Sequence, residues 1–185
     1  MRAADLTPVA RDAMKRPAGG KLVLASFLVA FVMQSLPWQD GMLLARPDFV
    51  LLVLLFWVIN EPRMIGLGLA FTLGLMVDVN DSMLLGQHAL AYVVAAFFAQ
   101  SLRVRILSFA LPEQALHILG LAVLASLVTL LLNLLLGQDF PGWAILASPL
   151  LTALAWFPLA WLIYHPRLRD ARRLGCAALG EAGGQ

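Results

Sequence analysis

Long apolar runs separated by short polar connections dominate the chain. The runs cover residues 22–36, 49–59, 64–77, 83–102, 115–136 and 143–164. A transmembrane helix needs about 20 mostly apolar residues to cross a hydrocarbon core about 30 Å thick. The second run covers only about 17 Å at 1.5 Å per residue, so we extend it with residues 42–45. The pattern predicts six transmembrane helices.

A polar turn interrupts the apolar pattern between the second and third runs. Glu61, Pro62 and Arg63 follow directly on Asn60. A proline disfavours the helical conformation in the residue before it, so the second helix is expected to end here. The second and third helices are therefore predicted to form a hairpin.

The composition indicates an all-α membrane protein and excludes several other classes. Hydrophobic residues make up 61% of the 185 residues and charged residues only 13%, and the mean hydropathy is +0.85. Such values lie outside the range of soluble domains. The net charge is +2, and the basic residues sit at the ends of apolar runs, so no nucleic-acid partner is expected. Cys176 is the single cysteine, which excludes an intrachain disulfide.

The basic residues predict the orientation in the membrane. With six spans, twelve of the 13 Lys and Arg residues fall on one side and only Arg46 falls on the other. Cytoplasmic loops collect Lys and Arg, so we expect both termini in the cytoplasm. The first run lacks a small-residue cleavage site and is interpreted as an uncleaved helix. Residues 1–21 then form a basic arm, 22–164 the six-helix domain, and 165–185 a basic and then flexible tail attracted to anionic lipid.

Polar side chains inside the apolar runs are the candidate functional residues. Counting the rise along each helix places Asp78 about 22 Å above the inner interface and His88 about 10 Å below the outer one. Gln34 lies about 20 Å up its own helix, and Gln87 is next to His88 in the chain. We therefore expect Asp78, His88 and Gln87 to approach one another in the outer half of the membrane.

Two interpretations of these polar residues remain open. An ionisable group inside a membrane is a functional candidate, yet Asp78 would also serve simply to cap its helix end. For His88 the simpler interpretation is a structural hydrogen bond, because one histidine with one or two acids does not define a metal site.

Small residues at four-residue spacing predict where helices pack closely. Short side chains let helix backbones approach one another in a membrane, where packing drives association. The third and fourth helices each carry such a stripe, and the predicted packing positions are Gly66, Ala70, Gly74, Gly86, Ala91, Ala95 and Ala99.

Motifs for catalysis are absent from the sequence. There is no Gly-x-Ser-x-Gly elbow, no phosphate-binding loop, no His-Glu-x-x-His and no second acid deep in another span. We therefore expect no enzyme activity, no cofactor and no metal.

Several short motifs resemble those of the bacterial rod shape-determining MreD family. They are Pro47-Asp48-Phe49, Phe56-Trp57, Glu61-Pro62-Arg63, Gly66-Leu67-Gly68, the stretch from Gly74 to Asp78 and the stretch from Leu84 to Leu90. The resemblance is most specific between residues 46 and 105. In that family the position of Phe56 is often tyrosine, and the tail carries no family motif.

The resemblance implies a non-enzymatic component of the cell-elongation machinery in the bacterial inner membrane, needed for rod shape and lateral peptidoglycan synthesis. The implied partners are MreC above all, then MreB, RodA and a class B penicillin-binding transpeptidase. The implied fold is like the six-helix substrate-binding subunits of energy-coupling-factor transporters. That likeness gives an alternative function, a vitamin-binding transporter subunit. The first helix offers only Ser26 and Ala30 at the small-residue spacing that such a subunit uses for docking, which weakens the alternative.

Overall fold

The computed structural model describes residues 19–36, 46–82, 85–137 and 146–163. Nearly all of the predicted basic arm, the whole predicted tail and Cys176 lie outside these residues. The described residues form helices and no strands, in agreement with the predicted all-α class. The helices are α2 (Gly20–Gln34), α3 (Phe49–Asn60), α4 (Leu67–Asn80), α5 (Gln87–Ser108), α6 (Leu111–Leu135) and an unlabelled helix, Ala147–Ile163.

Two of the six helices are long and apolar enough to cross a membrane by themselves. These are α5, with 22 residues, and α6, with 25. The other four apolar helices have between 10 and 17 residues. Six membrane spans and the likeness to transporter subunits therefore stay predictions.

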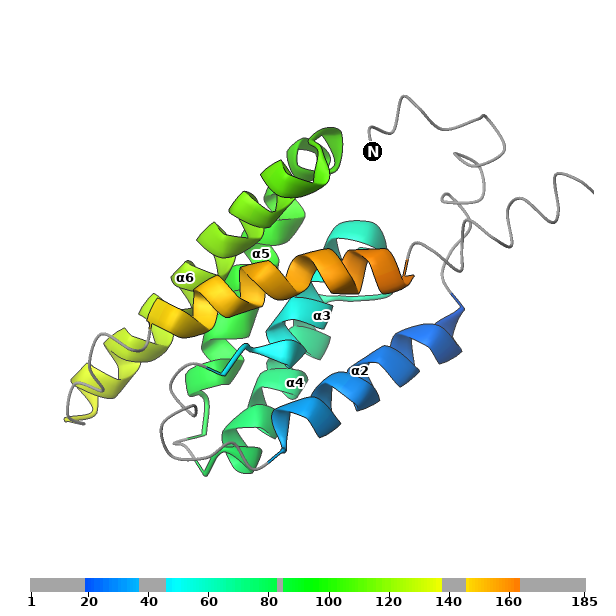
Figure 1. Ribbon diagram of the computed structural model, residues 1–185. Coiled ribbons are helices and arrows are strands. Elements are labelled where there is room, and N and C mark those ends of the chain that lie inside the picture. The colour runs from blue at the N-terminus through cyan, green and yellow to red at the C-terminus, as the bar shows by residue number, and fades with distance from the viewer. Residues whose placement is uncertain (1–18, 37–45, 83–84, 138–145, 164–185) are drawn as a thin grey trace, which may run out of the picture.

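Helix α3 forms the centre of the bundle, with the other helices around it (Figure 1). All ten residues from Val50 to Ile59 are buried, and the helix packs against α2 and α5. A helix that is apolar on every side is expected to be enclosed on every side. The Ala147–Ile163 helix closes one flank, where the rings of Trp156 and Phe56 lie 5.7 Å apart.

Helix α3 is only 12 residues long, and side chains bond backbone groups at both of its ends. At its start, the Asp48 carboxylate accepts a hydrogen bond of 2.9 Å from the Leu51 amide. At its end, Nε of Arg103 in α5 donates to the Ile59 carbonyl oxygen at 2.6 Å. These contacts satisfy backbone groups that a helix end leaves without intrahelical partners. Glu61, Pro62 and Arg63 then lie in the connection to α4.

Helices α4 and α5 form a closely packed pair with Gly74 at the point of contact. A Cβ atom built on Gly74 would lie 2.5 Å from the Ala89 nitrogen and 2.7 Å from the His88 carbonyl carbon, and nearer still to the Ala89 Cα. Only a glycine allows this approach of two backbones. Four other small residues that the sequence assigns to packing are buried. They are Ala70, Ala91, Ala95 and Ala99.

Two of the predicted packing glycines have other surroundings. No atom lies within 4 Å of the position that a Cβ would take on Gly66 or Gly86. Gly86 precedes α5 with a φ of 107°, a left-handed conformation that glycine adopts without strain. Its place in the fold depends on this turn rather than on close helix packing.

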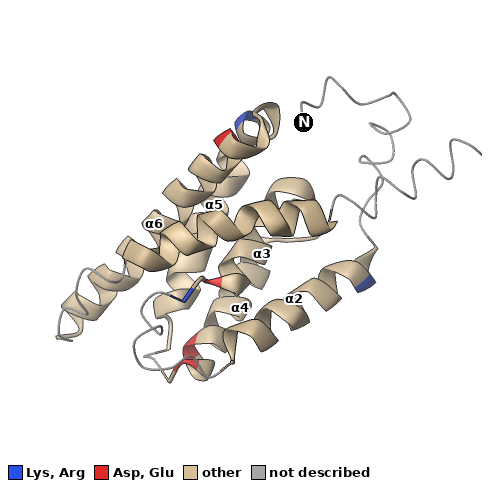
Figure 2. Cartoon of the chain, viewed as in Figure 1, with Lys and Arg blue, Asp and Glu red and all other residues tan. Residues whose placement is uncertain are grey.

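The charged side chains of the described residues lie near the ends of the helices and in their connections (Figure 2). The long middle parts of the helices are almost entirely uncharged, as a hydrocarbon environment requires. This arrangement concentrates polar contacts at the two ends of the bundle.

Candidate functional site

Asp78, near the end of α4, binds the start of the neighbouring helix α5. Its side chain is fully buried. The carboxylate accepts hydrogen bonds from the amides of Gly86 at 2.8 Å and His88 at 2.9 Å, and a longer one from Ala89 at 3.4 Å. The first amides of a helix lack intrahelical acceptors, and their partial positive charge favours an anion. Asp78 therefore caps α5 from another helix.

His88 adds a side-chain contact to this cap. Its Nδ1 lies 2.9 Å from Oδ1 of Asp78, and its side chain keeps 18% exposure. Asp78 and His88 thus lie as close together as the rise along their two helices predicts. The imidazole ring also meets the ring of Tyr92 edge to face, with centroids 6.0 Å apart.

A second carboxylate, the half-buried Asp48, caps α3 and bonds the tyrosine that packs on His88. The Tyr92 hydroxyl donates to Oδ1 of Asp48 at 2.6 Å. The Asp48 amide donates to Oγ1 of Thr152 at 2.9 Å, which joins the Ala147–Ile163 helix to the start of α3. Two helix starts are thus held by two acids that α5 connects through His88 and Tyr92.

Gln34 bonds the start of α3 rather than Asp78. It is 2% exposed, and its Oε1 accepts from the Phe49 amide at 3.1 Å. Its own carbonyl oxygen accepts from Nη1 of Arg46 at 2.9 Å. Nη2 of Arg46 pairs with the Asp81 carboxylate. Gln34, Arg46, Asp48, Asp78, Asp81, His88 and Tyr92 are called the polar cluster below.

Gln87 does not join the polar cluster by a hydrogen bond. The residue is 2% exposed, and neither its amide nitrogen nor its oxygen has a hydrogen-bond partner among the described residues. No hydrogen bond therefore joins the Gln87 side chain to Asp78, although Asp78 bonds the amides of both chain neighbours of Gln87. At this end, α4 and α5 are joined by Asp78 and His88 instead.

Replacing Gln87 with leucine is expected to raise the stability of the protein by about 1 kcal/mol or more, because a buried amide without partners costs desolvation energy. The thermal unfolding midpoint of the purified protein in detergent measures the effect. A lower midpoint in the variant would mean that the amide bonds a group outside the described residues.

The geometry of the polar cluster suits structural capping better than catalysis or metal binding. The described residues contain no group of three or more His, Cys, Asp or Glu side chains that would hold a metal ion. The carboxylates of Asp78 and Asp48 already accept backbone amides and a neighbouring side chain. Both oxygens of Asp78 and Oδ1 of Asp48 therefore hold α3, α4 and α5 together.

Sequence analysis missed several members of the polar cluster. Asp48 had a usable signal, since an acid directly before an apolar run is a typical helix cap. Tyr92 follows His88 by four residues, which places both on one helix face. Arg46 appeared only as the single basic residue on the outer side. Its pairing with Asp81, 35 residues away, has no local signal.

Comparisons with known proteins agree on one family. The family described as rod shape-determining protein MreD matches residues 15–165. A relative from Haemophilus influenzae, named rod shape-determining protein MreD, is 28% identical over 151 residues, which cover 82% of this chain and 90% of that protein. No solved structure matches the chain. These findings give no support to a transporter subunit.

Proposed function

Because this chain belongs to the rod shape-determining protein MreD family, we propose that it is a non-enzymatic, multi-pass component of the cell-elongation machinery in the bacterial inner membrane. The match over residues 15–165 carries the proposal, since it includes every described helix. Membership supports a role in rod shape. The proposal adds that the protein acts by binding other proteins during lateral peptidoglycan synthesis.

The committed contacts of the polar cluster support a role without catalysis. Both oxygens of Asp78 and Oδ1 of Asp48 cap helices, and His88 lies against Asp78. A general acid or base needs a free position beside a substrate, and a nucleophile needs an activating base. We propose instead that the cluster keeps α3, α4 and α5 in one arrangement so that the bundle presents a constant surface to its partners.

MreC is the partner that we propose first. MreB, RodA and a class B penicillin-binding transpeptidase follow as members of the same machinery, and anionic lipid is the proposed contact of the basic segments at both ends of the chain. No ligand or cofactor enters this proposal.

Depletion of the protein from its rod-shaped host is expected to give round cells, and MreC is expected to co-purify with it from detergent extracts. Cell width and length measured by microscopy, with re-expression of the unaltered chain as the control, test the first result. Normal rods after depletion, together with no recovery of MreC, would contradict the proposed function. Tight binding of a vitamin by the isolated protein would instead favour the transporter alternative.

Both termini are expected in the cytoplasm, with the connection between α4 and α5 outside, because of the twelve-to-one distribution of basic residues. The native Cys176 should resist an impermeant maleimide in spheroplasts and react after permeabilisation. In a Cys176→Ser background, a Ser82→Cys variant should react without permeabilisation. Reaction of Cys176 from outside would disprove the six-span orientation.

A further inference from the structure

Two side chains of α5 hold the connection between α3 and α4. Nε of Arg103 donates to the Ile59 carbonyl oxygen at 2.6 Å. Nε2 of Gln100, about one turn earlier in α5, donates to the Ile65 carbonyl oxygen at 3.4 Å. Arg63 lies between these two anchored positions and is exposed. It therefore sits in a segment that is bonded to α5 on both sides of it.

Arg103 and Arg63 carry positive charges that no described carboxylate neutralises. The ion pairs formed between described residues both belong to the polar cluster, at the opposite end of the bundle. Arg103 is half-buried, and its bond to Ile59 uses one of the five N–H donors of the guanidinium. A half-buried guanidinium favours an anion as its partner, because removing an unpaired charge from water is costly.

The rise along α5 places Arg103 at the boundary between hydrocarbon and headgroups. Arg103 lies about 22 Å along the helix from His88. With His88 about 10 Å below the outer interface, Arg103 is about 32 Å below it, at the far side of a hydrocarbon core about 30 Å thick. Phospholipid phosphates lie at this level. An acidic segment of a cytoplasmic protein would have to enter the headgroup layer to reach the same guanidinium.

The start of α4 leaves room for a headgroup next to this connection. Gly66 is the N-cap residue of α4, and no side chain caps the helix there. No atom lies within 4 Å of the position that a Cβ would take on Gly66 or Gly68. The backbone here supplies space, and the two arginines supply the charge.

The charges at this end of the bundle favour an anionic headgroup over a zwitterionic one. The described residues here include four basic and two acidic side chains, which are Lys21, Arg63, Arg103 and Arg105 against Glu61 and Glu113. Phosphatidylcholine would add the positive charge of its amine to this basic excess. Phosphatidylglycerol carries the phosphate without an amine, so its net charge is negative.

We propose that Arg103 and Arg63 bind the phosphate of one anionic phospholipid of the inner leaflet, beside the start of α4. The planar guanidinium of Arg103 can offer two parallel N–H groups to two phosphate oxygens, the geometry that makes arginine–phosphate pairs strong. The site is separate from the basic segments at the two ends of the chain. It requires the predicted orientation, which labelling of Cys176 tests, and is independent of cell shape, which depletion tests.

Native mass spectrometry of the full chain, released from nanodiscs of equal phosphatidylglycerol and phosphatidylcholine, tests this site. We expect one phosphatidylglycerol on the unaltered chain and about a tenfold loss of its retention in Arg63→Gln, which removes a charge-assisted hydrogen bond. Arg105→Gln is the matched control, because Arg105 is exposed and lies about 200° around α5 from Arg103. Equal losses in the two variants, equal retention of both lipids, or no retained lipid would overturn the proposal.

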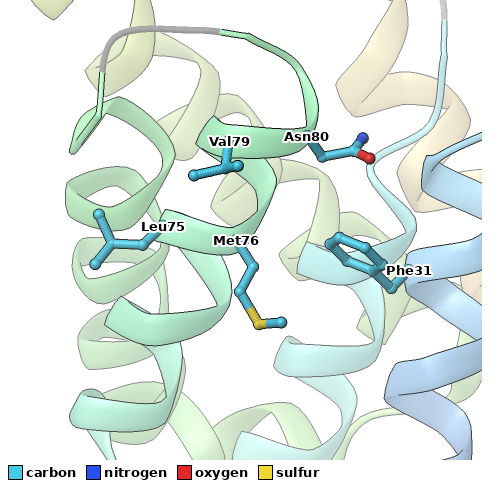
Figure 3. A pocket seen from close by; sticks show the side chains of 5 residues that line it. All are labelled: Phe31, Leu75, Met76, Val79 and Asn80. Atoms are coloured by element: carbon cyan, nitrogen blue, oxygen red, sulfur yellow. The ribbon is translucent and has the colours of Figure 1, made fainter.

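An apolar groove near the other end of α4 supplies a second control. Its lining side chains are uncharged and are Phe31, Leu75, Met76, Val79 and Asn80 (Figure 3). Met76→Trp changes the shape of this groove and leaves both arginines unaltered. The variant should retain phosphatidylglycerol as the unaltered chain does. A loss as large as that in Arg63→Gln would mean that apolar contact, and not the phosphate, holds the lipid.

Thermal unfolding in detergent gives an independent measurement. Added phosphatidylglycerol should raise the unfolding midpoint of the unaltered chain and of Arg105→Gln, but not that of Arg63→Gln, since a ligand stabilises only the protein that binds it. Excess inorganic phosphate should not displace the lipid, whose acyl chains stay in the micelle. Displacement by phosphate would indicate a site for a soluble anion. Loss of the lipid in a complex with MreC or MreB would indicate a site for a protein, and either result would contradict the proposed ligand.

Discussion

Replacing Gly74 with alanine is expected to force α4 away from α5 and to destabilise the protein by about 3 kcal/mol or more. The new methyl group would lie 2.5 Å from the Ala89 nitrogen and 2.7 Å from the His88 carbonyl carbon, well inside van der Waals contact. Backbone atoms of a long helix cannot rotate aside as a flexible side chain does. The same displacement would pull Asp78 from the start of α5. A Gly74→Leu variant should be worse still.

Thermal unfolding of the detergent-purified variants, followed by size-exclusion chromatography, measures this effect. Gly68→Ala is the matched control on the same helix, because no atom lies within 4 Å of the Cβ position there. That control should keep or slightly gain stability, since alanine is a better helix former. Similar unfolding midpoints for Gly74→Ala and Gly68→Ala would show that α4 and α5 do not meet at Gly74. In cells, Gly74→Ala should also lose MreC on purification.

Replacing Asp78 with leucine is expected to cost about 3 to 5 kcal/mol, because it leaves three backbone amides and the His88 ring without the acceptor that they share. Asparagine keeps one acceptor oxygen, so Asp78→Asn should fall between leucine and the unaltered chain. His88→Ala should cost less than either, because the backbone amides of Gly86, His88 and Ala89 keep their acceptor.

The order of the three unfolding midpoints is the measurement that matters. Leucine should unfold first, asparagine next and the His88→Ala variant last. If His88→Ala were as damaging as Asp78→Leu, the side-chain pair and not the helix cap would be the stabilising contact. If all three variants unfolded at the same midpoint as the unaltered protein, the cap would not contribute to the stability of the fold.

Sequence reasoning succeeded where the signal was local or periodic. Pro62 predicts the end of α3, and counting rise along two antiparallel helices brings Asp78 level with His88. The four-residue spacing of Gly66, Ala70 and Gly74 indicates a close helix pair, and the structure places the tightest contact at Gly74. Each of these inferences needs only the geometry of one helix or one hairpin.

The parts that were missed depend on contacts between distant segments. The bond from Tyr92 to Asp48 joins residues 44 positions apart, and Asp48 meets Thr152 across 104 positions. Burial of α3 on all sides was also not predicted. In a membrane protein, lipid and protein interior are equally apolar, so hydrophobic sequence alone does not separate a central helix from a peripheral one.

The unequal helix lengths have a mechanical consequence for the surrounding bilayer. Helices α2 and α4, with 15 and 14 residues, extend about 22 Å and 21 Å, whereas α5 and α6, with 22 and 25 residues, extend about 33 Å and 37 Å. Under the six-span prediction, a hydrocarbon layer about 30 Å thick would be compressed beside the short pair, and each ångström of mismatch would store a fraction of a kcal/mol. That elastic strain is released when another protein covers the short flank. The bilayer itself then favours assembly on the side of α2 and α4, in addition to any direct contact between the proteins.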